Sequence, residues 1–143
     1  MNERSGPFHA IVMDHFAHPR NMGEMENPDG IGEAKNPVCG DTMRLFIKVE
    51  ADRIVKATFL TFGCAAAIAA SSMTTEMIIG MTLEDALKVT RQAVSVALGD
   101  LPPTKVHCSV LAEAAIKAAI SGYQKKLVAS HSFFPGGEKK GEG

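Results

Sequence analysis

The sequence predicts an α+β fold in which a small antiparallel sheet is followed by helices. Apolar and polar residues alternate from Thr42 to Glu50, and β-branched and aromatic residues fill the segment from Ile54 to Phe62. Ala51 and Asp52 form a turn between these segments, so the two are expected to pair as neighbouring strands. After Gly63 the apolar pattern changes to a helical period. The sheet is therefore expected ahead of most of the helices.

One helix and a loop are predicted ahead of the sheet. Pro7 suits the first turn of a helix, and an apolar stripe at helical spacing follows it as far as Phe16. His18–Pro19 should end this helix, because a proline disfavours helical geometry in the residue before it. The Gly, Asn and Pro content of residues 21–31 is typical of a loop. A short third strand is expected from Ile31 to Pro37.

Several helices are predicted after the sheet. The segment Ala65–Ile78 is rich in alanine, whose small side chain lets another element approach closely. Thr82–Asp85 has the Thr-x-x-acid form of a capping box, which places one or two helices within Leu83–Leu98. The last helix should begin at Ser109, a good N-cap residue. A single narrow polar stripe on it indicates that most of its surface is buried. That stripe consists of Glu113, Lys117, Ser121 and Gln124.

Length and composition limit the domain organisation and the class of function. The 143 residues are expected to form one domain over residues 1–128, followed by a disordered Gly-, Lys- and Glu-rich tail over residues 129–143. A formal charge of −1 argues against nucleic acid or an anionic membrane as a partner. The apolar stretch Cys64–Ala70 is too short to span a bilayer, and the N-terminus lacks the apolar core of a signal peptide. A cytoplasmic location is therefore expected.

Three cysteines carry the functional information in this sequence. Cys39 lies in the loop Asn36–Asp41, Cys64 precedes the alanine-rich helix, and Cys108 precedes the helix expected from Ser109. An odd number of cysteines in a chain without an export signal argues against a disulfide framework and for reduced thiols. A helix N-terminus favours the thiolate, which is the form that binds metal. Three thiolates with a neighbouring His or Asp can make a four-ligand site for zinc or an iron–sulfur cluster.

Two residues beside the cysteines are candidates for the fourth ligand. Asp41 offers a hard oxygen ligand in the loop of the first cysteine, and His107 directly precedes Cys108. Adjacent residues of an extended chain point to opposite sides, so only one of His107 and Cys108 is expected to face a metal at a time. His15 and His18, on the first predicted helix, are interpreted as packing or surface residues. Considered one at a time, each cysteine could alternatively be a buried residue that packs like a small hydrophobic side chain.

Three motifs of the sequence resemble those of the iron–sulfur cluster scaffold family, the IscU-like and NifU N-terminal-like proteins. They are Asn-Pro-x-Cys-Gly-Asp around Cys39, Thr-Phe-Gly-Cys ending at Cys64, and Leu-Pro-Pro-x-Lys-x-His-Cys-Ser around Cys108. The resemblance extends from His15 to Tyr123. It implies a three-stranded antiparallel sheet packed with about five helices, in agreement with the α+β prediction.

This resemblance implies a scaffold rather than an enzyme. In the family, a cysteine desulfurase passes persulfide sulfur to the scaffold, donors supply iron and electrons, and a labile [2Fe–2S] cluster forms and is handed to an apo acceptor protein. Cys108 matches the cysteine that often receives the sulfur. A homodimer or higher oligomer around the cluster is compatible with the resemblance. The implied cluster ligands are Cys39, Cys64 and Cys108, with Asp41 or His107 as the fourth ligand or as a control of release.

The third motif differs from the chaperone-binding stretch of the bacterial family at one position. That stretch reads Leu-Pro-Pro-Val-Lys, whereas this chain has Leu101, Pro102, Pro103, Thr104 and Lys105. The resemblance implies recognition by a dedicated Hsp70 chaperone and its J-protein, and Thr104 puts that recognition in doubt. The SufU-like branch carries an insertion between its second and third cysteines and lacks the histidine before the third. This chain has no such insertion and does have that histidine, His107. These features favour the scaffold branch.

Other functions could use the same thiols. A zinc-bound sulfurtransferase would accept persulfide from a desulfurase and pass it on, and bound Zn²⁺ alone would not separate it from a scaffold. A zinc-stabilised interaction module would use the metal only to fold, and would unfold when the metal is removed. Cys–His hydrolysis is disfavoured, because nothing in the sequence identifies an oxyanion hole. A bound and transferable cluster is the property that distinguishes the scaffold.

Overall fold

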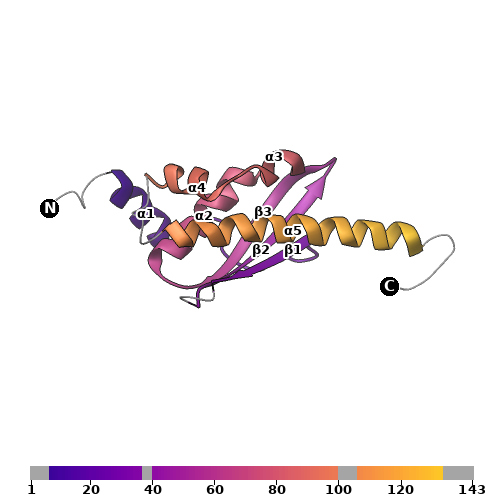
Figure 1. The fold of residues 1–143 in the computed structure, drawn as a ribbon, viewed down its shortest axis with the longest axis horizontal. Coiled ribbons are helices and arrows are strands. Elements are labelled where there is room, and N and C mark those ends of the chain that lie inside the picture. The colour runs from indigo at the N-terminus through magenta and orange to yellow at the C-terminus, as the bar shows by residue number, and fades with distance from the viewer. Residues whose placement is uncertain (1–6, 37–39, 100–105, 134–143) are drawn as a thin grey trace.

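The computed structural model describes residues 7–36, 40–99 and 106–133 of the chain. Within them, one three-stranded antiparallel sheet in the order β1-β2-β3 packs with five helices (Figure 1), which confirms the predicted α+β fold. The strands are β1 Gly30–Lys35, β2 Thr42–Glu50 and β3 Arg53–Phe62. The helices are α1 Pro7–Ala17, α2 Ala65–Ile78, α3 Leu83–Leu87, α4 Arg91–Ala97 and α5 Val106–Phe133.

The strand predictions hold within one or two residues, because both turn chemistry and alternation act locally. β2 and β3 form a hairpin through Ala51 and Asp52, whose φ angles of 53° and 60° are those of a two-residue turn with both residues left-handed. Gly23 and Asn21 exchange backbone hydrogen bonds with Phe59, so the predicted loop ahead of β1 runs along β3. This loop therefore covers part of the outer edge of the sheet.

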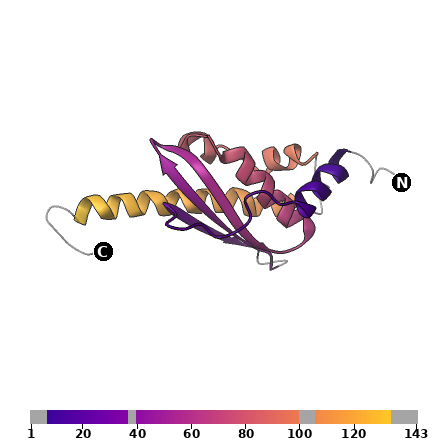
Figure 2. The ribbon, with the colours of Figure 1, turned by 180° about the vertical axis from the view of Figure 1, so that it is seen from behind.

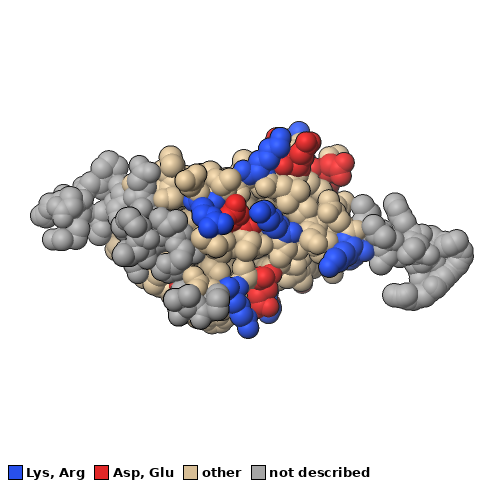
Figure 3. All heavy atoms as spheres, viewed as in Figure 1, with Lys and Arg blue, Asp and Glu red and all other residues tan. Residues whose placement is uncertain are grey.

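The core lies between the sheet and the two long helices that follow it. Met43, Leu45 and Ile47 of β2 are fully buried on this face, as the alternation predicts. Helices α2 and α5 pack against β3 and against β1 and β2, respectively. The view from behind shows the strands in front of α5 (Figure 2). On the face seen in Figure 3, basic and acidic side chains are interspersed among uncharged ones.

The contact between α5 and β1 depends on glycines. A Cβ added to Gly32 would lie 2.5 Å from the Ala115 carbonyl oxygen and 2.8 Å from the Ala118 carbonyl carbon. A Cβ on Gly30 would meet the Ala119 carbonyl oxygen of the same helix. Carbon atoms in van der Waals contact lie about 3.5–4.0 Å apart, so no side chain fits between this strand and this helix. The two backbones are therefore in direct contact, which sets the position of α5 on the sheet.

One prediction about α5 needs correction. The helix begins at Val106 rather than after Ser109, so Ser109 is not the N-cap. Ser109 is fully buried and its hydroxyl has no hydrogen-bond partner among the described residues. The capping preference of a serine therefore does not set the start of this helix. At the other end α5 continues to Phe133, and the predicted domain boundary at residue 128 stays a prediction.

Residues 134–143 lie outside the described residues, and disorder there stays a prediction. None of the helices in the described part of the chain is long and apolar enough to cross a membrane. The helix α3 is capped by Thr82, whose hydroxyl accepts a hydrogen bond from the Asp85 amide at 3.1 Å, as the capping box predicts. A second helix, α4, fills the rest of the segment up to Leu98.

Candidate metal centre

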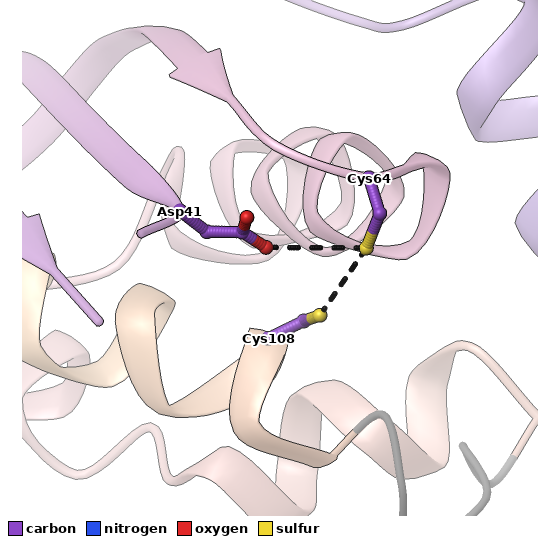
Figure 4. A group of neighbouring side chains, drawn as sticks. All are labelled: Asp41, Cys64 and Cys108. Carbon is purple, nitrogen blue, oxygen red and sulfur yellow. Dashed lines mark hydrogen bonds between the residues drawn. The ribbon is translucent and has the colours of Figure 1, made fainter. Parts of the chain in front are cut away.

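Three of the predicted ligands meet at one end of the sheet. The ligand atoms of Asp41, Cys64 and Cys108 all lie within 4.8 Å of one another (Figure 4). The Cys64 Sγ atom is 3.9 Å from Asp41 Oδ2 and 3.8 Å from Cys108 Sγ. These residues are 23 and 44 positions apart along the chain, so only the fold brings them together.

The hairpin explains why Asp41 and Cys64 are neighbours. In an antiparallel pair, the start of one strand lies beside the end of the next. Thr42, the first residue of β2, pairs with Phe62, the last residue of β3. Asp41 therefore stands just before the pair and Gly63–Cys64 just after it. Helix α5 lies across the sheet and delivers Cys108 from its first turn to the same point.

Two helix N-termini point at the site. Cys64 is the N-cap residue of α2 and has an extended backbone, with φ −77° and ψ 175°. Its side chain makes no capping hydrogen bond, so the sulfur is directed at the neighbouring ligands rather than at its own helix. Cys108 is the third residue of α5. The partial positive charge at a helix N-terminus stabilises negative charge, so both positions suit ligands of a metal site.

The spacing of the two sulfurs matches one tetrahedral metal ion. With metal–sulfur bonds of about 2.3 Å, two thiolates on tetrahedral zinc lie about 3.8 Å apart. The observed separation is 3.8 Å, far longer than the S–S bond of about 2.05 Å in a disulfide. Asp41 supplies an oxygen at a third position around the same point. These three side chains are therefore close enough to act together as ligands of one zinc or iron ion.

The three ligand residues differ in their exposure to solvent. Cys108 is only 1% exposed, whereas Asp41 and Cys64 are half-buried. The neighbouring Gly40 and Gly63 are exposed. A metal ion held here would be covered from the side of α5 and reachable from the side of the loops.

A pair of buried hydroxyl groups fixes the turn that carries Cys64. The Thr61 and Ser71 oxygens lie 2.7 Å apart, and Ser71 donates to the Ala67 carbonyl oxygen at 2.9 Å. Because the Ser71 proton is used in that bond, Thr61 is the donor to Ser71. This bond joins the end of β3 to α2 across the Gly63–Cys64 connection. No sequence motif indicates this bond, because it joins a strand residue to a helix residue ten positions away.

The other predicted site residues are placed less completely. Cys39 and the predicted chaperone contact, residues 101–105, lie outside the described residues. His107 is the second residue of α5, and nothing is described of its side chain. The expectation that only one of His107 and Cys108 faces a metal at a time assumed an extended chain, whereas both residues lie in α5. It stays a prediction. Both are helical, and adjacent helical residues are about 100° apart around the axis.

His15 of α1 and His18, which follows this helix, have the packing and surface roles expected of them. His15 is 5% exposed, and its Nδ1 lies 2.8 Å from the buried Ser72 hydroxyl. Burial lowers the pKa of His15, the nearby Arg20 lowers it further, and the carboxylate of Glu76 opposes this shift. His18 is largely exposed. Neither histidine belongs to the metal centre.

The fold and the converging thiols define a class of protein: a small α+β domain with a group of side chains able to hold metal at the end of its sheet. A family model described as the NifU-like N-terminal domain matches residues 8–130. The chain is 57% identical over 115 residues to the iron–sulfur cluster assembly scaffold protein IscU 1 of Archaeoglobus fulgidus, covering 80% of this chain and 75% of that protein. It is 47% identical over 121 residues to the scaffold protein IscU of Buchnera aphidicola, covering 82% of this chain and 94% of that protein.

Solved structures agree with this assignment. A putative iron–sulfur cluster assembly scaffold protein for the SUF system from Fervidobacterium islandicum superposes with a TM-score of 0.66 at 28% identity, over 77% of this chain and 93% of that one. The N-terminal part of a NifU-like protein from Brucella abortus has the same fold, with a TM-score of 0.71 at 16% identity over 84% of this chain and 96% of that one. The chain belongs to the NifU-like N-terminal domain family, as its motifs predict, and its high-identity relatives are IscU scaffold proteins.

Proposed function

We propose that this chain receives sulfur from a cysteine desulfurase, assembles a labile [2Fe–2S] cluster and transfers it to apo acceptor proteins. The observation that carries the proposal is the convergence of Asp41, Cys64 and Cys108 within 4.8 Å at the end of the sheet. Membership of a family whose relatives are named as assembly scaffolds supports it. In this role the chain is a carrier rather than an enzyme, and the cluster is its cargo.

The cluster needs ligands beyond the two converging thiols. A [2Fe–2S] cluster held by four protein ligands has two of them on each iron. Cys64 and Cys108 are spaced for a single metal ion, so they suit one iron. The second iron would then take Cys39 together with Asp41 or His107. A single metal ion bound by the converging side chains is therefore the simplest first stage of assembly.

Sulfur delivery involves Cys108 in this proposal. Its thiolate would attack the terminal sulfur of the desulfurase persulfide, forming a persulfide on Cys108 and releasing the desulfurase cysteine as a thiolate. Because Cys108 is 1% exposed, this step requires the first turn of α5 to move or its cover to open. Cys64 is half-buried and more accessible. Mapping of the persulfide by mass spectrometry distinguishes the two cysteines.

Asp41 is expected to make the cluster labile. A carboxylate is a harder ligand than a thiolate and holds iron–sulfur units less firmly. The variant Asp41→Ala should therefore lengthen the lifetime of the cluster, by several-fold or more, measured from the decay of visible absorbance in air. Faster decay in Asp41→Ala than in the wild type would contradict this role.

The second candidate is a zinc-bound sulfurtransferase that accepts persulfide from a desulfurase. It is favoured by the same 3.8 Å sulfur separation, because that is also the spacing on tetrahedral zinc. In this case Zn²⁺ would be the resident metal, and the thiols would carry sulfur without building a cluster. The two functions differ in what happens when iron is present.

Anaerobic reconstitution separates these candidates. The wild-type chain is incubated with Fe²⁺, cysteine and a cysteine desulfurase, and its absorbance and bound iron and sulfide are measured. The scaffold predicts a [2Fe–2S] spectrum that is lost in the variants Cys39→Ser, Cys64→Ser and Cys108→Ser. Persulfide on Cys108 with retained Zn²⁺ and no cluster would identify the sulfurtransferase instead. Lys117→Ser on the exposed face of α5 is a matched surface control.

The remaining partners belong to the same proposal. Iron and electrons would come from donor proteins, and cluster release would be assisted by an Hsp70 chaperone with its J-protein at residues 101–105. Restoring the bacterial motif with Thr104→Val tests the chaperone contact, since a tighter interaction is expected if Thr104 weakens it. A cytoplasmic site of action and an oligomer formed around the cluster complete the proposal. Sedimentation before and after cluster loading measures the oligomer directly.

A further inference from the structure

We propose that Gly63 is a positioning residue of the metal centre, because its missing side chain leaves the space in which the Asp41 carboxylate reaches Cys64. A Cβ added to Gly63 would lie 2.7 Å from Asp41 Cγ and 2.9 Å from Asp41 Oδ2. Carbon atoms in contact lie about 3.5–4.0 Å apart. A side chain at position 63 and the Asp41 carboxylate in its present position therefore exclude each other. This inference rests on the proposed function and assigns a further residue to it.

The backbone gives no other reason for a glycine at this position. Among the described residues, the glycines with positive φ are Gly23, Gly40, Gly80 and Gly99, and Gly63 is not one of them. Gly63 is also exposed, so it does not fill a tight place in the core. An alanine could adopt its backbone conformation. The reason for a glycine at position 63 is therefore steric: a Cβ there would clash with its close neighbours.

The carboxylate is the neighbour that would have to move. The third close atom is the Cβ of Ala67, at 3.1 Å, which is fixed in the first turn of α2. The main chain of Asp41 is held by the Asn36 amide, which donates to the Asp41 carbonyl oxygen at 2.9 Å. Only the side chain of Asp41 can turn freely. Its rotation would carry the oxygen away from the Cys64 sulfur, 3.9 Å from it in the present position.

The consequence is a selective change in the ligand set. The variant Gly63→Ala should keep both thiols and lose the carboxylate from the centre. It should therefore reproduce Asp41→Ala, although Asp41 itself is unchanged. A turn that is merely damaged would instead displace Cys64 and weaken the centre more than Asp41→Ala does.

The first test uses Co²⁺ as a spectroscopic probe of the ligands. Wild type, Asp41→Ala, Gly63→Ala and the double variant are titrated with Co²⁺, and affinity and visible bands are recorded. Each single variant should lose affinity by the same factor, about 10–100-fold, with the same band shift. The double variant should match either single variant. A wild-type spectrum for Gly63→Ala, or losses that multiply in the double variant, would overturn the inference.

The second test needs no metal and measures the exclusion itself. Gly63→Ala is introduced into wild type, Asp41→Asn and Asp41→Ala, and the urea midpoint of the apo chain is measured. Asn keeps the volume of Asp, so the midpoint should fall in wild type and in Asp41→Asn alike. In Asp41→Ala the carboxylate is gone and only the contact with the Ala67 Cβ at 3.1 Å remains, so the fall should be much smaller. An equal fall in all three backgrounds would show that Asp41 is not the neighbour concerned.

Cluster lifetime provides a third readout with a definite sign. Gly63→Ala should lengthen the lifetime as Asp41→Ala does, whereas a displaced Cys64 would shorten it, and shortening would overturn the inference. If the wild type cannot be loaded with a cluster, the proposed scaffold function fails. The Co²⁺ and urea measurements still decide the role of Gly63 in that event, so the two failures are distinguishable.

Discussion

Gly32 and Gly63 are both places where a side chain does not fit, but they differ in what fills the space. Beside Gly32 stands the backbone of α5, with the Ala115 carbonyl oxygen 2.5 Å from an added Cβ. Beside Gly63 stands the end of the Asp41 side chain. Backbone inside a packed helix cannot move without moving the helix, whereas a carboxylate can rotate. The first contact therefore belongs to the fold and the second to the site.

The largest expected effect is at Gly32. Gly32→Ala forces α5 away from the sheet, and overpacking of this kind costs about 1–3 kcal/mol or more of unfolding free energy. Urea denaturation measures the loss. Gly80→Ala is the control, because Gly80 has φ +96° and open space around it, so only backbone strain of about 1–2 kcal/mol is expected there. If Gly32→Ala lowered the unfolding free energy no more than Gly80→Ala does, the contact between Gly32 and α5 would not be essential to the fold.

The hydroxyl pair beside the site should show the next largest effect. Ser71→Ala leaves the buried Thr61 hydroxyl without its partner, at a cost of about 1–3 kcal/mol, and loosens the turn that carries Cys64. Both stability and Zn²⁺ affinity should fall. Thr74→Val is a matched control in the same helix, since the Thr74 hydroxyl bonds to Ala70 within α2. Unchanged Zn²⁺ affinity in Ser71→Ala would remove this pair from the support of the site.

The anchoring of α1 should depend on pH through His15. Burial lowers the pKa of His15 in the folded chain, so the unfolded chain binds more protons below the ordinary value near 6.5. Stability is therefore complete above that pH and falls as the pH falls through it. Comparing urea midpoints at pH 5.5 and 7.5 measures the dependence, which His15→Gln should weaken. The exposed His18→Gln is the control, and an equal effect there would contradict the assignment.

The smallest effect is expected at the hairpin turn, at the opposite end of the sheet from the site. Ala51 has φ 53°, a conformation that asparagine tolerates better than alanine does. Ala51→Asn should raise the unfolding free energy by about 0.5–1 kcal/mol. Ala114→Asn, on the exposed surface of α5, should instead lower it slightly through helix propensity. A loss of stability in Ala51→Asn would show that the turn is not strained.

Local patterns made most of the fold predictable. Helix α2 occupies Ala65–Ile78 and β2 occupies Thr42–Glu50, as predicted, because period and turn chemistry are properties of neighbouring residues. The start of α5 was not predicted, because Ser109, a residue type favoured at the N-cap, lies inside the helix. The ligand types at Asp41, Cys64 and Cys108 could be read from motifs, whereas their spacing depends on elements far apart in the chain.

The supporting contacts were beyond the reach of sequence. The exclusion between Gly63 and Asp41 joins residues in two different elements, and so does the bond between Thr61 and Ser71. In the sequence, Gly63 is only a glycine before a cysteine, and Thr61 and Ser71 belong to no recognisable motif. Only the three-dimensional arrangement shows which atoms compete for the same space.

Direct transfer of a cluster tests the central claim most closely. The loaded chain is mixed anaerobically with an apo-ferredoxin in the presence of a strong iron chelator, and both proteins are separated and their spectra recorded over time. The account predicts that the ferredoxin gains a [2Fe–2S] cluster at the rate at which this chain loses one, despite the chelator. Loss of the cluster to the chelator, with the ferredoxin left empty, would contradict a scaffold that hands its cargo to an acceptor.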